Sequence, residues 1–144
     1  MADIKLRTAQ KIVSGALKFA REKNFKPLAV VVYDARGALK AYGAEDGTSL
    51  KRGEIAMGKA TGALALGISS RALAKMAAER PHFVSAAVTA LGGAMIPVPG
   101  GVLLRDKRGE LVGAVGISGD TSDNDELAAV AGAEDAGLTA ETGA

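Results

Sequence analysis

The stretch PVPGGVLLRDKRGELVGAVGISGDTSDNDE, residues 97–126, decides the fold of this chain. Its apolar runs Val102 to Arg105 and Leu111 to Ser118 predict two strands. The sequence DKRG between them predicts a tight turn, because Asp can bond backbone amides ahead of it and Gly tolerates positive φ. Acidic residues then crowd the start of the apolar run Leu127 to Ala133, as is favourable at a helix N-terminus. The stretch therefore predicts a β-hairpin followed by a helix.

An earlier stretch repeats this design. Leu28 to Tyr33 is a β-branched apolar run that predicts a buried strand, and Ala38 to Gly43 predicts a second one. The sequence DARG joins them, as DKRG joins the later pair. We expect two antiparallel hairpins in a single sheet.

Helices are predicted in most of the remaining chain. They cover Thr8 to Lys23, a segment capped by Ser49, a segment from a cap at Ser69 or Ser70 to Glu79, and His82 to Leu91. Ala94 to Val98 is expected to form an edge strand that ends at its prolines, and Ala136 to Ala144 is expected to fray. The predicted fold class is α/β (α+β): one domain, residues 1–144, with a mostly antiparallel five-stranded sheet flanked by helices.

Composition narrows the function classes. Of 144 residues, 48% are hydrophobic but only 3% are aromatic, so the core must consist of aliphatic residues and alanine. The net charge is +2 with the two signs interspersed, and this gives nucleic-acid binding little support. The absence of cysteine excludes disulfides and thiolate metal sites. No apolar run is long enough to span a bilayer and no signal-like segment begins the chain, so we expect a cytoplasmic protein without a membrane span.

Glycines provide one set of candidate site residues. After two prolines, Gly100 and Gly101 can bend the backbone tightly, and we expect one of them to have positive φ and to border the main pocket. The amides of Ser118, Gly119 and the residues up to Thr121 lie beside a predicted helix start, where they can bind an anionic group. For Gly113, Gly116 and Gly119, which are spaced GxxGxxG, close packing of a strand under a helix is the more common explanation. Helix capping likewise explains the acidic residues 120–126 better than a hard cation does.

Charged side chains provide the other candidates. His82 is the only histidine, and it is either an ordinary surface residue or a metal ligand. Lys59 lies on a helix of otherwise small residues and Arg105 at a hairpin end, where each can meet a ligand carboxylate or remain in solvent.

These segments resemble a known family. The run GGAMIPVPGGVLLRDKRGELVGAVGISGDTSDNDE at 92–126 is similar to the C-terminal signature of the GlcG/HbpS family of haem-binding proteins, which includes the C-terminal domain of PduO adenosyltransferases. EIAMGKATGALALG at 54–67 and LAVVVYDARGALKAYGAEDG at 28–47 resemble its central helix and first hairpin. The resemblance implies a profilin-like sandwich, assembly into dimers, tetramers or octamers, and haem or a related tetrapyrrole as ligand. Some relatives place an axial histidine near the first helix, whereas Leu6 to Lys23 has none.

Three functions follow as hypotheses. The favoured one is a haem-binding protein for uptake, degradation or redox sensing, with His82 as the best axial donor. Weaker donors by residue type are Met57, Met76, Met95 and Tyr42. The second is an enzyme acting on a small anionic metabolite in a glycine-lined pocket, and the third is an accessory oligomer without a ligand. We also expect a homo-oligomer, because helical faces rich in alanine and glycine allow close approach between subunits.

Overall fold

The computed structural model describes residues 3–143. The elements follow the chain in this order: α1 Leu6–Glu22, β1 Ala29–Asp34, β2 Leu39–Ala44, α2 Arg52–Leu66, α3 Ser70–Glu79, α4 Pro81–Ala90, β3 Gly101–Arg105, β4 Leu111–Ser118, α5 Ser122–Asp135 and β5 Thr139–Glu141. The predicted order of helices and strands is confirmed as far as α4, and again for β3, β4 and α5. The fifth strand lies elsewhere than predicted.

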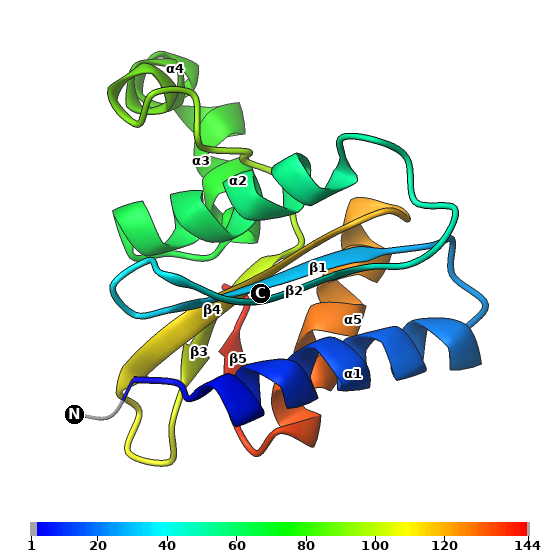
Figure 1. Ribbon diagram of the computed structural model, residues 1–144. Helices are drawn as coiled ribbons and strands as arrows, with labels where there is room; N and C mark the ends of the chain where they lie inside the picture. The colour runs from blue at the N-terminus through cyan, green and yellow to red at the C-terminus, as the bar shows by residue number, and fades with distance from the viewer. Residues whose placement is uncertain (1–2, 144) are drawn as a thin grey trace.

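The sheet is open and antiparallel, with the strand order β2-β1-β4-β3-β5. β1 pairs with β2, and β3 pairs with β4, so both predicted hairpins are confirmed. The two hairpins join through β1 and β4, whose register runs from Ala29 opposite Ser118 to Asp34 opposite Gly113. Figure 1 shows these strands as one twisted layer between helices.

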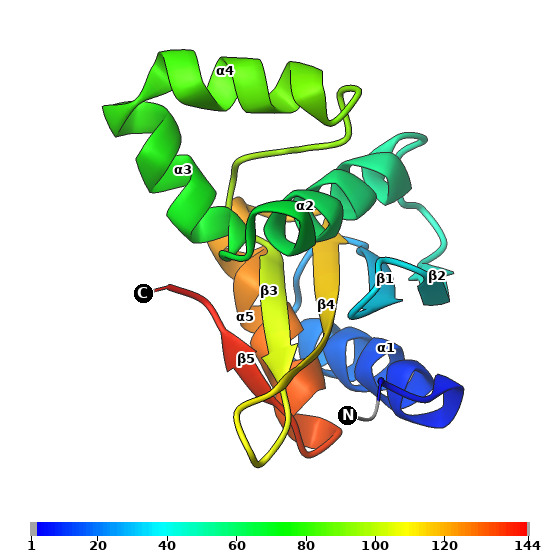
Figure 2. The same ribbon diagram turned by 90° about the vertical axis from the view of Figure 1, so that its left-hand side faces the viewer.

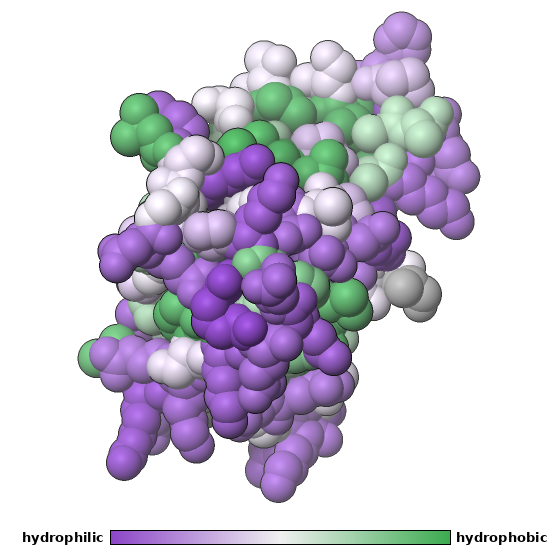
Figure 3. All heavy atoms as spheres, turned by 90° about the vertical axis from the view of Figure 1, so that its right-hand side faces the viewer, coloured by the Kyte–Doolittle hydropathy of each residue, from purple (hydrophilic) through white to green (hydrophobic). Residues whose placement is uncertain are grey.

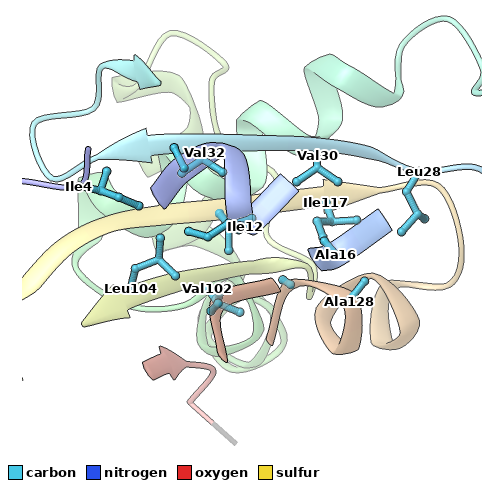
Figure 4. Close-up of a cluster of buried hydrophobic side chains, with 14 of the residues drawn as sticks. Ile4, Ile12, Ala16, Leu28, Val30, Val32, Val102, Leu104, Ile117 and Ala128 are labelled. Carbon is cyan, nitrogen blue, oxygen red and sulfur yellow. The ribbon is translucent and has the colours of Figure 1, made fainter. Parts of the chain in front are cut away.

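Helices cover both faces of the sheet. α1 and α5 lie side by side on one face and α2 lies on the other (Figures 1 and 2). Because side chains alternate along a strand, Val30 and Val32 of β1 face α1 and α5, where they pack around Ile12 (Figure 4). Val31 lies in the second cluster, with Ala56 of α2 and its neighbours. Both cores are built from aliphatic residues and alanine, as the composition requires.

α3 and α4 extend away from the sheet. Figure 2 shows α4 at the far end of the molecule, beyond α3 and α2. A third small apolar cluster, centred on Leu73, Val84 and Met95, connects α4 to the rest. α4 contains no Lys, Arg, Asp or Glu, yet Val84 is its only buried residue in the structure of residues 3–143. An apolar helix thus lies largely in solvent.

Two predictions about the sheet edge are wrong. Ala94 to Val98 forms no strand: this segment crosses α2, where the Ile96 amide donates to the Gly58 carbonyl at 3.1 Å. Glycines at 58 and 62 leave room there for the side chains of Ile96 and Met95. The segment expected to fray instead provides β5, which pairs with β3, while the last residue, Ala144, lies outside the described residues. Backbone pairing with β3 thus orders three residues that have no strong hydrophobic signal of their own.

Capping is confirmed at one predicted site and wrong at another. The Ser69 hydroxyl caps α3 by accepting from the Ala72 amide at 3.2 Å. Ser49 does not cap α2, because the cap position is Lys51, whose side chain makes no capping bond. The helix begins two residues later than a Ser49 cap requires, which leaves the Ser49 hydroxyl in the loop.

Candidate functional site

A buried ion pair joins three elements. Lys59 of α2 is only 2% exposed, and its Nζ donates to the Ile117 carbonyl of β4 at 2.9 Å and to Oδ2 of Asp125 at 3.1 Å. Asp125 lies in the first turn of α5 and is 1% exposed. The α2 helix approaches β4 closely enough for this contact because Gly116 has no Cβ that would overlap the Ala56 carbonyl.

Burial disfavours the charged forms of both Lys59 and Asp125. Burial raises the pKa of Asp125, and the charge of Lys59 and hydrogen bonds from the amides of Asp120 and Gly119 act in the opposite direction. Burial lowers the pKa of Lys59, against the attraction of Asp125. Each charge is therefore held in a poorly solvating site mainly by the other charge and by backbone hydrogen bonds.

The amides proposed for an anionic ligand already have a partner within the chain. The Asp120 amide donates to Oδ1 of Asp125 at 2.9 Å, and the Gly119 amide also bonds this carboxylate. The Thr121 amide donates to the Asp120 carboxylate at 2.7 Å. The carboxylates of Asp120 and Asp125 thus occupy the position at which an anion would meet these amides.

The acidic residues 120–126 bind backbone amides and form ion pairs. Thr121 caps α5 by accepting from the Asn124 amide at 3.2 Å, and Asp123 pairs with Arg71. Hydrogen bonds from the amides of Lys26 and Thr121 lower the pKa of Asp120. Between residues 3 and 143 no group of three or more His, Asp or Glu side chains is placed to hold a metal ion. The acidic side chains are thus engaged by backbone amides, by Lys59 and by Arg71, while the cap itself is Thr121.

The glycine corner covers the ion pair. Gly100 has φ of 127°, which confirms the prediction that one of the two glycines has positive φ. A Cβ at Gly100 would lie 2.7 Å from Nζ of Lys59, and one at Gly101 would overlap the Lys59 carbonyl oxygen. The Gly101 amide also donates to the Ser70 hydroxyl at 2.7 Å. Only residues without a side chain allow the chain to pass so close to α2.

Five of the predicted site residues come together here: Lys59, Gly100, Gly101, Ser118 and Gly119. Arg105 lies elsewhere, on β3, where its Nε pairs with Glu141 of β5 at 2.7 Å. His82 also lies apart, exposed in the first turn of α4. The expectation that Gly100 or Gly101 borders a ligand pocket stays a prediction.

A small pocket opens beside this centre. It has a volume of about 220 Å³ and is lined by Lys26, Pro27, Gly47, Thr48, Ser49, Arg52 and Gly119. Arg52 connects the pocket to the predicted site, since its NH1 donates to the Ser118 hydroxyl at 3.1 Å. Sequence analysis did not single out Arg52, Lys26 or Asp125. Only the acidic run offered a signal, and it could not show that Asp125 pairs with Lys59.

The fold and this arrangement define an α/β protein with an antiparallel sheet and a buried lysine–aspartate centre. The chain belongs to the HbpS-like family: the model described as "Haem degrading protein HbpS-like" matches residues 4–134. No curated protein matches the chain significantly.

Solved structures support the same fold. The PduOC–haem complex is 21% identical, with a TM-score of 0.86 over 97% of this chain and 99% of that one. HbpS is 25% identical, with a TM-score of 0.79 over 93% of this chain and 90% of that one. Protein ORFY of Klebsiella pneumoniae is 22% identical, with a TM-score of 0.84 over 94% and 92%. Within residues 3–143, no helix combines the length and apolar character needed to cross a membrane.

Proposed function

We propose that this protein binds haem or a related tetrapyrrole. The observation that carries the proposal is membership of the HbpS-like family over residues 4–134, together with a shared fold in a structure that contains haem. A role in haem uptake, degradation or redox sensing in the cytoplasm is part of the same proposal.

The exposed face of α4 is our proposed binding surface. A tetrapyrrole needs an axial donor, an apolar contact area and a cation for its propionates. His82 supplies an imidazole in the first turn of α4, and the adjacent Phe83 is 41% exposed. Arg80 lies over the Phe83 ring, with its guanidinium carbon 4.7 Å from the ring centroid. These three groups lie within four residues of sequence, and each supplies one of the three kinds of group that a tetrapyrrole needs.

The Lys59 centre is a poorer candidate for the iron. Its lysine and aspartate are both buried and satisfy each other, so neither is available to a ligand without breaking the pair. His82, by contrast, lies on an uncharged helix that gains by being covered. We propose that a second copy of the chain covers α4, so that the tetrapyrrole site lies near a subunit boundary of a homo-oligomer.

Haem titration followed by absorbance tests this proposal. Wild-type protein should give a saturable Soret band, and His82→Ala should abolish it or shift it, because loss of the axial imidazole changes the iron ligand field. Tyr42→Phe and Met57→Leu, which remove two weaker donors, serve as controls and should leave the spectrum unchanged.

The outcomes separate the function from the site. Absence of saturable binding in the wild type would contradict haem binding. A saturable band that is identical in His82→Ala would retain haem binding but place the iron elsewhere. One such place is the groove of about 380 Å³ between α1 and β2, lined by Leu6, Gln10, Val13, Ser14, Lys40, Ala41 and Tyr42.

A further inference from the structure

We infer that the pocket beside Arg52 is a binding site for a small oxyanion, such as a phosphate or a carboxylate group. The site is separate from α4 and does not depend on the proposed haem function. It is formed by three loops and the first residue of α2, at the end of the molecule where α1 ends and α5 begins. Figure 3 shows this end, where hydrophilic residues gather below the more hydrophobic region at the top.

The charge of the pocket comes from two cations. Lys26 and Arg52 line it, and neither forms an ion pair within residues 3–143. The part-buried guanidinium of Arg52 uses NH1 to bond the Ser118 hydroxyl, which leaves most of its five N–H groups for another acceptor. A planar guanidinium with free donors is well suited to the two oxygens of a carboxylate or phosphate.

The acids near the pocket are occupied by other groups. The Asp120 carboxylate accepts from the amides of Lys26 and Thr121 and from the Asn124 side chain. Glu45 accepts from the Leu28 amide and pairs with Arg21. Asp125 is held by Lys59, and the exposed Asp46 directly precedes the lining residue Gly47. The Asp120 carboxylate keeps its charge and acts on Lys26. Arg52 has no carboxylate within ion-pair distance among residues 3–143, so its guanidinium is the main positive charge of the lining.

Arg52 also acts on the buried Lys59 behind the pocket, which is paired with Asp125. Arg52 lies close enough to Lys59 to lower the pKa of that lysine, although burial is the larger cause. An anion beside Arg52 would relieve part of this repulsion between like charges.

Hydroxyl groups and size narrow the ligand. Ser49 does not cap α2, and its exposed hydroxyl can donate to an anion in the pocket that it lines. The volume of about 220 Å³ is below the roughly 300–1,000 Å³ of pockets for drug-sized ligands. The chemistry is therefore that of one oxyanionic group, either a small free anion or the acidic end of a larger ligand.

Inorganic phosphate is the first probe. Amide shifts followed by NMR during a phosphate titration should saturate at residues 47–49, 52 and 119, and sodium chloride at equal ionic strength should not reproduce them. Arg52→Gln should weaken phosphate binding by about tenfold or more, because it removes a charge-assisted contact. Lys26→Gln, which alters an exposed side chain, should weaken it less and tests the site independently if Arg52→Gln fails to fold.

Arg108→Gln is the matched control, since it removes one exposed arginine charge in the β3–β4 turn. It should leave phosphate binding unchanged. Shifts that do not saturate, shifts that chloride reproduces, or equal affinity in the wild type and both pocket variants would overturn the inference.

Competition identifies the source of the oxyanion. If phosphate weakens haem binding in the wild type but not in Arg52→Gln, the pocket binds a propionate of the tetrapyrrole and the haem does not lie on α4. If phosphate and haem bind independently, the pocket serves a separate small anion. Both results support an oxyanion pocket, and failure of haem binding alone leaves the phosphate result intact.

Discussion

The Lys59 centre and the α4 surface have opposite relations to water. Lys59 and Asp125 are charged groups in the interior, and each has its partners within the chain. α4 is an uncharged helix on the outside, and most of its residues have no neighbour to cover them. Both depart from the usual distribution of polar and apolar residues. A buried charge or a large exposed apolar surface says more about a protein's function than a single exposed apolar residue does. The buried ion pair, whose groups have partners, indicates a structural role, whereas the uncovered α4 is the surface for which we propose a binding role.

The largest effect is expected when one charge of the buried pair is removed, and this tests whether the Lys59 centre has a structural role. Asp125→Ala would leave Lys59 buried without its counter-ion and would free the amides of Gly119 and Asp120. We expect a loss of about 3–5 kcal/mol in the free energy of unfolding, measured by urea denaturation.

The control is Asp123→Ala, two residues away. Its carboxylate is 76% exposed and pairs with Arg71 at the surface, so we expect a loss of about 0–1 kcal/mol. Similar losses for the two variants would mean that the buried pair has no special structural role.

The next test changes the glycine corner that covers the Lys59–Asp125 pair and leaves both charges in place. In Gly101→Val, the new side chain would overlap the Lys59 carbonyl oxygen, and α2 could not remain against β3. We expect a loss of about 1–3 kcal/mol in unfolding free energy. Gly101→Ala should lose less, and an unchanged melting temperature in both variants would contradict the close approach.

Particular residues show how far sequence reasoning extends. The two hairpins were predictable because each joins apolar runs through a D-x-R-G turn, and turn chemistry is local. The partner of Lys59 was not predictable, because Asp125 lies 66 positions away and resembles the capping acids around it. β5 was not predicted for a related reason: its three residues have no alternating hydrophobic pattern, and only pairing with β3 makes them a strand. Sequence therefore predicts local features well and misses those that depend on long-range contacts.

The smallest effect on the free energy of unfolding is expected for a substitution on α4, because most of this helix is not buried. Ala86→Glu places a charge on the exposed face of that helix, so stability should change by no more than about 0.5 kcal/mol. If a second copy covers α4, sedimentation should nevertheless show a clear shift toward the monomer. Ala38→Glu, on an exposed turn residue of the first hairpin, should leave the assembly intact. A wild-type protein that sediments as a monomer would contradict the proposed cover.

The strand order has a consequence for how the molecule folds. Each hairpin connects neighbouring segments, so β1 with β2 and β3 with β4 need only short loops to close. The centre of the sheet is different, because β1 and β4 come from distant parts of the chain. Closing that long loop costs entropy before its contacts can compensate. The β1–β4 ladder is therefore the step that should limit the folding rate, and the hairpins should form before it.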